Sequence, residues 1–276
     1  KLETFSAQNM EGVLKIFTAR DLDNKLDNSM DFSVITNKDG NKAAAPTRPI
    51  LADKKVCFVG EAIAAIVATS KKFALNAIEA IEYELDEIDV HIKTEVGGSV
   101  IHQEAQNNVA VDWCYGSETN IEHIFEKAEH KVKLRIEDNR VFANPIETRG
   151  CFAEFENNKL HLCFNGQGVW GTRKALAKKL HMKKEQVRIT NPDVGGGFGM
   201  KGFDYPEYFM VALAAKELKL SVKWISERGE GLLTDNGGRD LVTDAEASFD
   251  KNYKITGIKI NFKVKIIFFN SIVFLY

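Results

Sequence analysis

The residues best suited to chemistry lie in one stretch, Asn191–Gly202, which reads NPDVGGGFGMKG. It sets five glycines around Phe198, and an ordered glycine loses more backbone entropy than any other residue. Bare Cα atoms and unshielded N–H groups allow a backbone to lie against a bulky anion. A solvated linker does not normally hold a large apolar ring between its glycines. The stretch therefore favours a ligand-binding loop, with a flexible connector as the alternative.

Two phosphate-binding patterns can be tested on this stretch. The P-loop pattern fails, because Lys201 follows Met200 and precedes Gly202, where that pattern requires Gly and then Ser or Thr. The dinucleotide pattern is met by the spacing of Gly197, Gly199 and Gly202, although other residues separate these glycines from the flanking strand and helix patterns. A dinucleotide-binding oxidoreductase that uses these three glycines therefore remains an alternative function.

Composition describes an ordinary globular chain. The 276 residues are 44% hydrophobic and 28% charged, which suits about two domains. A net charge of -2 gives no electrostatic reason to expect a nucleic acid or an anionic membrane as partner. The chain starts at Lys1, and Leu2–Met10 lacks the basic start and apolar core of a signal peptide. We expect a cytoplasmic protein without a membrane span.

Cysteine and histidine spacing predicts no metal site made of protein ligands. No CxxC joins the four cysteines, Cys57, Cys114, Cys151 and Cys163. No HExxH or paired-ligand spacing occurs among the six histidines, His91, His102, His123, His130, His161 and His181. The strand patterns around Cys57 and Cys163 predict small buried thiols rather than a disulfide framework.

The elements around the glycine stretch predict how it is positioned. A strand at Leu160–Phe164, a helix at Val169–Leu180 and a strand at Val187–Thr190 form a βαβ unit. Its right-handed crossover makes the strands parallel, so residues 165–167 and the glycine stretch leave the same sheet edge. A helix at Pro206–Leu218 then follows. Ligands of α/β proteins bind at such an edge.

Other segments complete an α/β (α+β) chain. Strands are expected at Gly12–Thr18, Val56–Val59, Ala62–Ala68, Tyr83–Asp86, His130–Ile136, Cys151–Phe155, Val222–Ile225 and Asp244–Phe249. One helical turn is expected at Ala19–Leu22, and helices are expected at Ser70–Ile81, with Ser70 as N-cap, and at Ile121–Ala128. The apolar run Lys263–Tyr276 is too short to cross a bilayer as a helix and indicates either an unpaired strand or sequence past a truncation.

Several motifs occur together in one order. Asp193–Gly199 with Lys201, the Lys55–Glu61 stretch KVCFVGE, the Asn144–Cys151 stretch NPIETRGC, and Gln167 resemble the large subunits of the molybdenum hydroxylases. This family includes xanthine dehydrogenases, aldehyde oxidases and carbon monoxide dehydrogenases. The resemblance covers roughly residues 12–260. It implies a hammerhead domain at 1–93, a linker at 94–119, an incomplete first molybdopterin-binding domain at 120–263, and a truncated or aberrant tail at 264–276.

The resemblance also implies a cofactor, molybdenum bound to molybdopterin, in its plain or cytosine dinucleotide form. Molybdopterin brings its own sulfur ligands to the metal, so the protein need supply none. The residues implied at the cofactor are Gln167, Gly196, Gly197, Phe198, Gly199 and Arg149. Of these, Gln167 and Phe198 are implied near the molybdenum, with Gln167 as a donor to a cofactor oxygen and not as a metal ligand.

Each of these side chains has a plainer interpretation. Gln167 also suits a helix start that faces water. Arg149 suits either a phosphate or an ion pair with Glu147 or another carboxylate. Lys201 suits a solvated loop charge or a pyrophosphate contact, and Phe198 suits a core residue under the loop.

The chain departs from the family pattern at some positions, and the resemblance also implies partner subunits. Xanthine-oxidising members carry a glutamate after the loop lysine, where this chain has Gly202, and the loop typical of carbon monoxide-oxidising members is missing. The family's general-base glutamate is expected beyond residue 276, so the chain alone should hold no catalytic residue and be inactive. The implied reaction oxidises an aldehyde, an N-heterocycle or a similar small molecule with water as oxygen source. Electrons would leave through [2Fe-2S] and FAD subunits or domains, in an oligomer. A non-catalytic interaction module that docks through the apolar tail is the other alternative.

Overall fold

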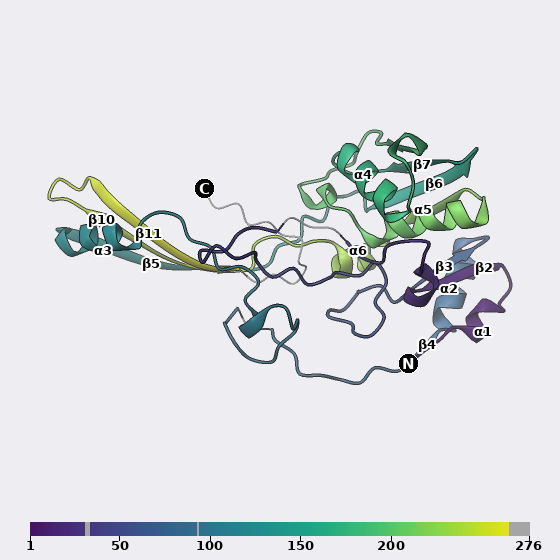
Figure 1. Cartoon of the computed structure of the whole chain (residues 1–276), viewed down its shortest axis with the longest axis horizontal. Coiled ribbons are helices and arrows are strands. Elements are labelled where there is room, and N and C mark those ends of the chain that lie inside the picture. The colour runs from purple at the N-terminus through teal and green to yellow at the C-terminus, as the bar shows by residue number, and fades with distance from the viewer. Residues whose placement is uncertain (31–33, 93, 265–276) are drawn as a thin grey trace. The chain divides into compact units, whose positions relative to one another are not determined.

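The computed structural model describes residues 1–30, 34–92 and 94–264 (Figure 1). They form two compact units, each drawn from several parts of the chain. The first unit holds Lys1–Asp31, Thr47–Ile88 and Ala143–Asn236, and the second holds Phe32–Pro46, Asp89–Phe142 and Gly237–Tyr276. Both units combine helices and strands, which confirms the predicted α/β (α+β) class.

The first unit is built on a four-stranded sheet of order β8-β7-β6-β9. Its strands are β6 (Gly150–Glu156), β7 (Lys159–Phe164), β8 (Val187–Thr190) and β9 (Val222–Ile225). The pair β7 and β8 is parallel, as the βαβ pattern predicts, and the other two pairs are antiparallel. Alternate residues of β6, namely Cys151, Ala153 and Phe155, are buried, so one face of the sheet carries the core.

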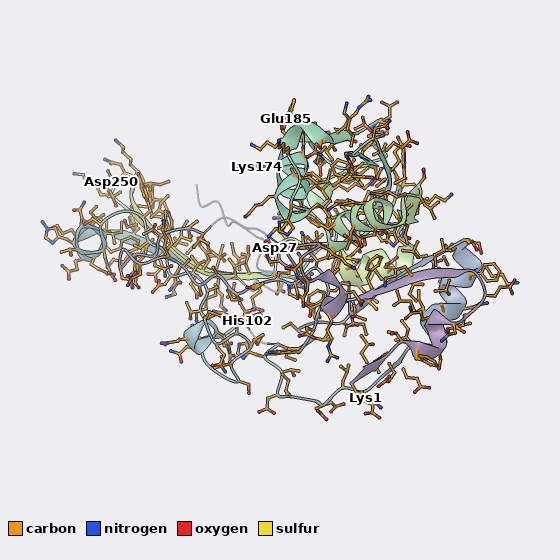
Figure 2. All side chains as sticks on the ribbon, turned by 45° about the vertical axis from the view of Figure 1, so that its right-hand side comes forward. Lys1, Asp27, His102, Lys174, Glu185 and Asp250 are labelled. Atoms are coloured by element: carbon orange, nitrogen blue, oxygen red, sulfur yellow. The ribbon has the colours of Figure 1, made fainter. Side chains whose placement is uncertain are left out.

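Helices α4 (Trp170–Lys179) and α5 (Pro206–Leu218) pack on this sheet (Figure 1). Pro206 suits the first turn of α5 because that position has no helical N–H bond to lose. The pattern of Phe209, Leu213 and Leu218 predicts one apolar face, but the whole run 208–215 is buried. The helix is thus enclosed on most sides, which a single amphipathic stripe could not indicate. Lys174 on α4 and Glu185 after it are exposed at the surface (Figure 2).

The remaining elements of the first unit are short. They are β1 (Leu2–Glu3), α1 (Phe5–Gln8), β2 (Val13–Thr18), η1 (Ala19–Leu22), β3 (Ala64–Ala68), α2 (Lys71–Glu79), β4 (Glu82–Tyr83), η3 (Lys184–Gln186), η4 (Met200–Gly202) and α6 (Arg228–Thr234). Ser70 caps α2 by accepting a hydrogen bond from the Phe73 N–H. Strands β2 and β3 pair antiparallel, and β1 pairs with β4.

The prediction of two buried strands around Gly60-Glu61 is wrong in part. Residues 56–59 form a loop, and only Ala64–Ala68 forms a strand, which is half-buried. The loop closes on itself, because the Cys57 N–H donates to the Glu61 carboxylate and the Glu61 N–H donates to the Phe58 carbonyl. These local bonds replace the ladder that a strand would need.

The open face of the four-stranded sheet carries a polar cross-strand cluster. His161 Nδ1 lies 2.9 Å from the Glu154 carboxylate, and His161 Nε2 lies 2.8 Å from the Thr190 hydroxyl. Phe152 packs edge-on against the imidazole. Glu154, His161 and Thr190 come from β6, β7 and β8 and lie at neighbouring positions of the sheet. The cluster therefore stabilises the carboxyl end of β8, where the glycine stretch begins.

The second unit is a three-stranded antiparallel sheet of order β11-β10-β5. Its elements are η2 (Gln106–Asn108), α3 (Glu118–Lys127), β5 (His130–Asp138), β10 (Leu241–Phe249) and β11 (Ile255–Val264). Helix α3 is capped by Ser117 and packs on β11, where Gly257 leaves room for Ile121 and Ile124. Within the described ranges, no helix has the length and apolar character needed to cross a membrane. Most of the predicted apolar tail, residues 265–276, lies outside the described residues.

Candidate functional site

Four connections of the first unit meet at one edge of its sheet. Strand β6 starts beside the end of β7, because Cys151 pairs with Phe164, and β8 ends beside β7, because Thr190 pairs with Cys163. Strand β9 also ends there, since Ile225 pairs with Gly150. The connections are residues 143–149, 165–169, 191–205 and 226–227. Strand topology thus confirms that the glycine stretch and the Gln167 loop open on the same edge.

Gln167 lies directly against the glycine stretch. A Cβ atom built on Gly197 would sit 2.5 Å from Gln167 Cδ, so only glycine fits at this position without moving the glutamine. The Gln167 N–H donates a 3.0 Å hydrogen bond to the Lys201 carbonyl oxygen. Gln167 is exposed, precedes α4, and is held by the glycine stretch rather than by the helix.

Three other glycines of the stretch, Gly195, Gly196 and Gly199, each meet a separate requirement. A Cβ atom on Gly195 would lie 2.6 Å from Glu147 Cβ, so residue 195 must be glycine for the two loops to touch. Gly196 and Gly199 have φ angles of +95° and +82°, which side chains rarely tolerate. The glycines therefore shape this loop and bring it close to its neighbours, and the flexible-connector alternative does not apply.

A row of backbone donors is left open on this loop. Within the described residues, the N–H groups of Gly196, Gly197, Phe198 and Gly199 have no hydrogen-bond acceptor. Consecutive N–H groups of this kind form a concave site for an anion. Beneath the loop, the Asn191 side-chain Nδ2 donates to the Gly166 carbonyl, while its buried Oδ1 has no partner. The loop thus carries four backbone donors without an acceptor, and one buried acceptor beneath it lacks a donor.

Phe198 is held in a conformation that is unusual for a bulky residue. Its φ is 51°, in the left-handed region, and its side chain is 75% exposed. The interpretation of Phe198 as a core residue is therefore wrong. Its ring lies beside Gly196, because a Cβ atom there would come within 2.8 Å of Phe198 Cε2. A strained backbone that holds an apolar ring in solvent is typical of a binding site.

Glu147 and Lys201 join two of the loops. Glu147 Oε2 accepts one hydrogen bond of 2.8 Å from the Gly195 N–H and another of 2.8 Å from Lys201 Nζ. The Lys201 side chain is fully buried, so the interpretation of Lys201 as a solvated loop charge is wrong. Burial raises the pKa of Glu147, but the bonds from Lys201 and Gly195 outweigh it and hold that pKa below its usual value. The pair therefore stabilises the fold at neutral pH and is lost as the pH falls through this lowered pKa.

Arg149 lies in a buried cluster and not at the loop surface. Its Nε donates to Asp235, 2.5 Å away, and its Nη1 donates to Glu207, 2.8 Å away. Its guanidinium also stacks 3.8 Å from the centre of the Tyr205 ring. Burial lowers the pKa of Arg149, but the two carboxylates outweigh burial and raise it. Because the side chain is 0% exposed, the structure does not support Arg149 as a cofactor contact, nor its pairing with Glu147.

No role was predicted from the sequence for two residues that hold the loop before β6 in place, Arg228 and Asn165. Arg228 donates a hydrogen bond of 2.5 Å to the Asn144 side-chain oxygen and one of 2.7 Å to the Ile146 carbonyl. It therefore holds the loop before β6 in place. Asn165 accepts from the Gly150 N–H and donates to the Thr148 carbonyl, which ties the same loop to the end of β7. Asparagine directly after a strand is the one hint that could have indicated the second of these roles.

The dinucleotide alternative does not match this geometry. Strand β8 ends at Thr190, and α5 starts at Pro206, so the whole of residues 191–205 lies between strand and helix. The dinucleotide fingerprint needs its glycines in a tight turn that directly opens a helix. Gly197, Gly199 and Gly202 instead belong to a long loop that includes a short 3-10 turn.

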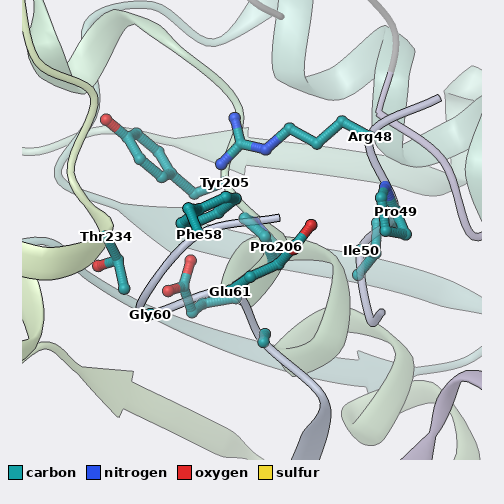
Figure 3. A pocket seen from close by; sticks show the side chains of 11 residues that line it. Arg48, Pro49, Ile50, Phe58, Gly60, Glu61, Tyr205, Pro206 and Thr234 are labelled. Carbon is teal, nitrogen blue, oxygen red and sulfur yellow. The ribbon is translucent and has the colours of Figure 1, made fainter. Parts of the chain in front are cut away.

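A small cavity lies elsewhere in the first unit, between residues 48–62 and the start of α5 (Figure 3). Its volume is about 20 Å³, which is room for about one water molecule. Arg48, Glu61 and Tyr205 line it, and burial raises the pKa of Glu61. The cavity is too small for an organic ligand and is separate from the glycine loop.

The four cysteines are all free thiols, and Cys151 is buried. The prediction of a buried Cys57 is wrong, because this residue lies in the exposed loop that replaced the predicted strand, and Cys163 is half-buried. In the part of the chain that the structure describes, no three His, Cys, Asp or Glu side chains gather as metal ligands would.

Comparison with known families matches most of the chain. The aldehyde oxidase and xanthine dehydrogenase a/b hammerhead domain matches residues 1–89, and the molybdopterin cofactor-binding domain matches residues 101–266. The nicotine 6-hydroxylase large subunit of Paenarthrobacter nicotinovorans is 30% identical over 94% of this chain and 32% of its own length. The carbon monoxide dehydrogenase large chain of Hydrogenophaga pseudoflava is 29% identical over 95% of this chain and 34% of its own.

Solved structures share the fold. Carbon monoxide dehydrogenase from Oligotropha carboxidovorans superimposes with a TM-score of 0.82 at 24% identity, over 95% of this chain and 34% of that one. Quinoline 2-oxidoreductase from Pseudomonas putida 86 gives 0.75 at 24% identity, over 94% and 33%. The chain spans about a third of the length of the curated relatives that it matches. Because the cofactor-binding domain alone matches more than half of its residues, this chain belongs to the molybdopterin cofactor-binding family of aldehyde oxidases and xanthine dehydrogenases.

Proposed function

We propose that the edge formed by the Gln167 loop and the glycine stretch holds a molybdopterin cofactor in an oxidoreductase of small molecules. One observation carries the proposal most directly. The Gln167 side chain lies against Gly197, beside four consecutive backbone N–H groups that have no acceptor within the described residues. This arrangement suits an anionic, oxygen-rich group that must approach the backbone closely.

The residues at this edge fit such a cofactor. Backbone donors of Gly196, Gly197, Phe198 and Gly199 suit its phosphate or oxo groups, and the buried Asn191 Oδ1 still lacks a donor. A Cβ atom built on Gly199 would meet nothing within 4 Å, so open space lies above the loop. When bound, the cofactor supplies the two-electron oxidation of the substrate, with water as the oxygen source.

Side chains of this chain would position and orient the cofactor. The Gln167 amide would donate a hydrogen bond to a cofactor oxygen, and the exposed Phe198 ring would shield that region from water. Arg149 has no place among these contacts, because its guanidinium is buried between Glu207 and Asp235. The cofactor contacts in this proposal are therefore Gln167, Gly196, Gly197, Phe198 and Gly199.

The wider proposal concerns the whole protein. Its substrate would be an aldehyde, an N-heterocycle or a similar small molecule, and its electrons would pass to [2Fe-2S] and FAD subunits or domains in a cytoplasmic oligomer. Relatives named as large subunits or large chains support this organisation. The cofactor would be plain molybdopterin or its cytosine dinucleotide form. We also propose the domain boundaries 1–93, 94–119, 120–263 and 264–276, and inactivity of the 276-residue chain alone, because no general base is assigned within it.

Substitution of Gln167 tests the assignment. The variants Gln167→Ala and Gln167→Glu both remove the amide donor, whereas Glu keeps the side-chain volume against Gly197. A hydrogen bond to a charged group contributes about 1.5–3 kcal/mol, so kcat/KM of the whole protein should fall by about tenfold to a hundredfold in both variants. Steady-state kinetics with an aldehyde and an N-heterocycle measure this. If Gln167→Glu keeps full activity, the amide has no donor role and the assignment fails.

A further inference from the structure

Lys201 connects three loops through three different groups, its ammonium, its carbonyl and its backbone N–H. Its ammonium donates to Glu147 in the loop before β6. Its carbonyl accepts the Gln167 N–H from the loop after β7, and its own N–H donates 3.3 Å to the Gly197 carbonyl. A change in the position of Lys201 must therefore move both Gln167 and the glycine stretch.

Glu147 bonds the other end of the glycine stretch, at Gly195. Besides Lys201, its carboxylate accepts from the Gly195 N–H, and its own N–H donates 3.4 Å to the Gly195 carbonyl. Close packing adds to these bonds, because Gly195 offers no side chain and lies against Glu147 Cβ. Residues 195 and 201, the two ends of the stretch with the open N–H groups, are thus fixed to one carboxylate.

The burial of Lys201 indicates that the lysine links the loops and does not bind a phosphate. Its side chain is 0% exposed and its ammonium already lies 2.8 Å from a carboxylate. Because no part of the Lys201 side chain reaches the surface, a ligand at the loop cannot contact the ammonium unless the lysine first breaks its bond to Glu147 and leaves that carboxylate unpaired. The sequence left open a pyrophosphate contact for Lys201, and this geometry assigns it another task.

We propose that Glu147 and Lys201 form an ion-pair latch whose task is to hold the glycine stretch and Gln167 in the conformation that receives the cofactor. Both are positioning residues: neither contacts the cofactor, and both act through Gly195, Gly197 and Gln167. This inference rests on the proposed function for the identity of the ligand. The ordering of the loops by the latch does not depend on any ligand.

Amide hydrogen exchange of the whole protein, purified from a host that makes no molybdopterin, tests the latch without the cofactor. Lys201→Met removes the ammonium and leaves Glu147, which is 40% exposed, able to hydrate. Exchange at the hydrogen-bonded amides of Gln167, Gly195 and Lys201, followed in peptides that cover 165–169 and 191–202, should rise by about tenfold or more, because a charged hydrogen bond is lost. The run 208–215 of α5 should exchange as in the wild type.

Two further variants keep the test decisive. The double variant Glu147→Gln/Lys201→Met leaves no unpaired charge, so it replaces the single variant in the test if Lys201→Met does not fold. It should raise exchange no more than Lys201→Met alone, because both remove the same ion pair. Lys216→Met is the control, because it makes the same substitution and removes an ammonium that bonds a distant group, the Leu180 carbonyl, away from the loop. It should leave exchange at 191–202 unchanged.

The outcomes distinguish the latch from the proposed function. Unchanged exchange at 191–202 in both latch variants overturns the latch, and so does an equal rise throughout the first unit, which indicates only global destabilisation. Pterin content of the same variants, purified from a host that makes the cofactor, should fall at least about fivefold while the Lys216→Met control keeps it. A wild-type protein that matures without pterin overturns the proposed function, whereas the exchange result would still stand.

Discussion

Gly197→Ala should reduce the molybdenum and pterin content of the purified protein by about tenfold to a hundredfold. The added methyl group would lie 2.5 Å from Gln167 Cδ and 2.7 Å from Gln167 Cγ, so the glutamine must move. The exposed Gln167 side chain can swing aside, so the loss expected is that of its hydrogen bond to the cofactor, about 1.5–3 kcal/mol. Because the φ of Gly197 is not in the left-handed region, the effect comes from contact and not from backbone strain. Elemental analysis and fluorescence of the oxidised pterin measure both contents.

Gly202→Ala is the matched control for this prediction. It adds the same methyl group to the same loop, but the new atom would lie 3.9 Å from Gln167 Cβ, an ordinary contact distance. Its cofactor content should therefore match the wild type. Equal losses in the two variants, or none in Gly197→Ala, would show that the contact between Gln167 and Gly197 does not shape the site.

Arg149→Met should lower the free energy of unfolding by about 3–5 kcal/mol, because it leaves Glu207 and Asp235 without their buried counter-charge. The stack of the guanidinium on Tyr205 is lost as well. Urea denaturation followed by circular dichroism measures this change. A ligand role for Arg149 predicts a different result, in which cofactor content falls and stability of the cofactor-free protein does not.

Lys25→Met provides the comparison for Arg149. Lys25 forms an ion pair with Glu217 at 3.4 Å, but both side chains are about a third exposed. Loss of a partly solvated pair costs about 1 kcal/mol or less. A loss in Arg149→Met no larger than that in Lys25→Met would contradict the structural role that we assign to the buried cluster.

Local patterns in the sequence are sufficient to predict the strands and the helix that position the site. Alternation in β7 and β8, and the helix between them, predict the parallel pair that sends Gln167 and the glycine stretch to one edge. The three consecutive glycines before Phe198 predict close backbone approach, and the structure gives each of the three a contact or a φ angle that requires glycine. These features follow from short-range spacing.

Contacts between distant residues could not be predicted in the same way. Lys201 bonds Glu147 across 54 positions, and Arg149 bonds Asp235 across 86, so no spacing rule assigns either charge its partner. Helix α6 was also missed, because Gly229 and Gly231 disfavour a helix. Its start is nevertheless stabilised by the Glu227 N–H bond to the Glu230 carboxylate, and Arg228 uses that position to hold the loop before β6.

Molybdenum and pterin content of the whole protein, matured in its native host, tests the central claim most directly. The proposed function predicts about one molybdenum and about one pterin per chain, with both contents reduced together in Gly197→Ala. A fully matured protein that contains neither molybdenum nor pterin would contradict the claim. The open N–H groups of the glycine stretch would then require another anionic ligand.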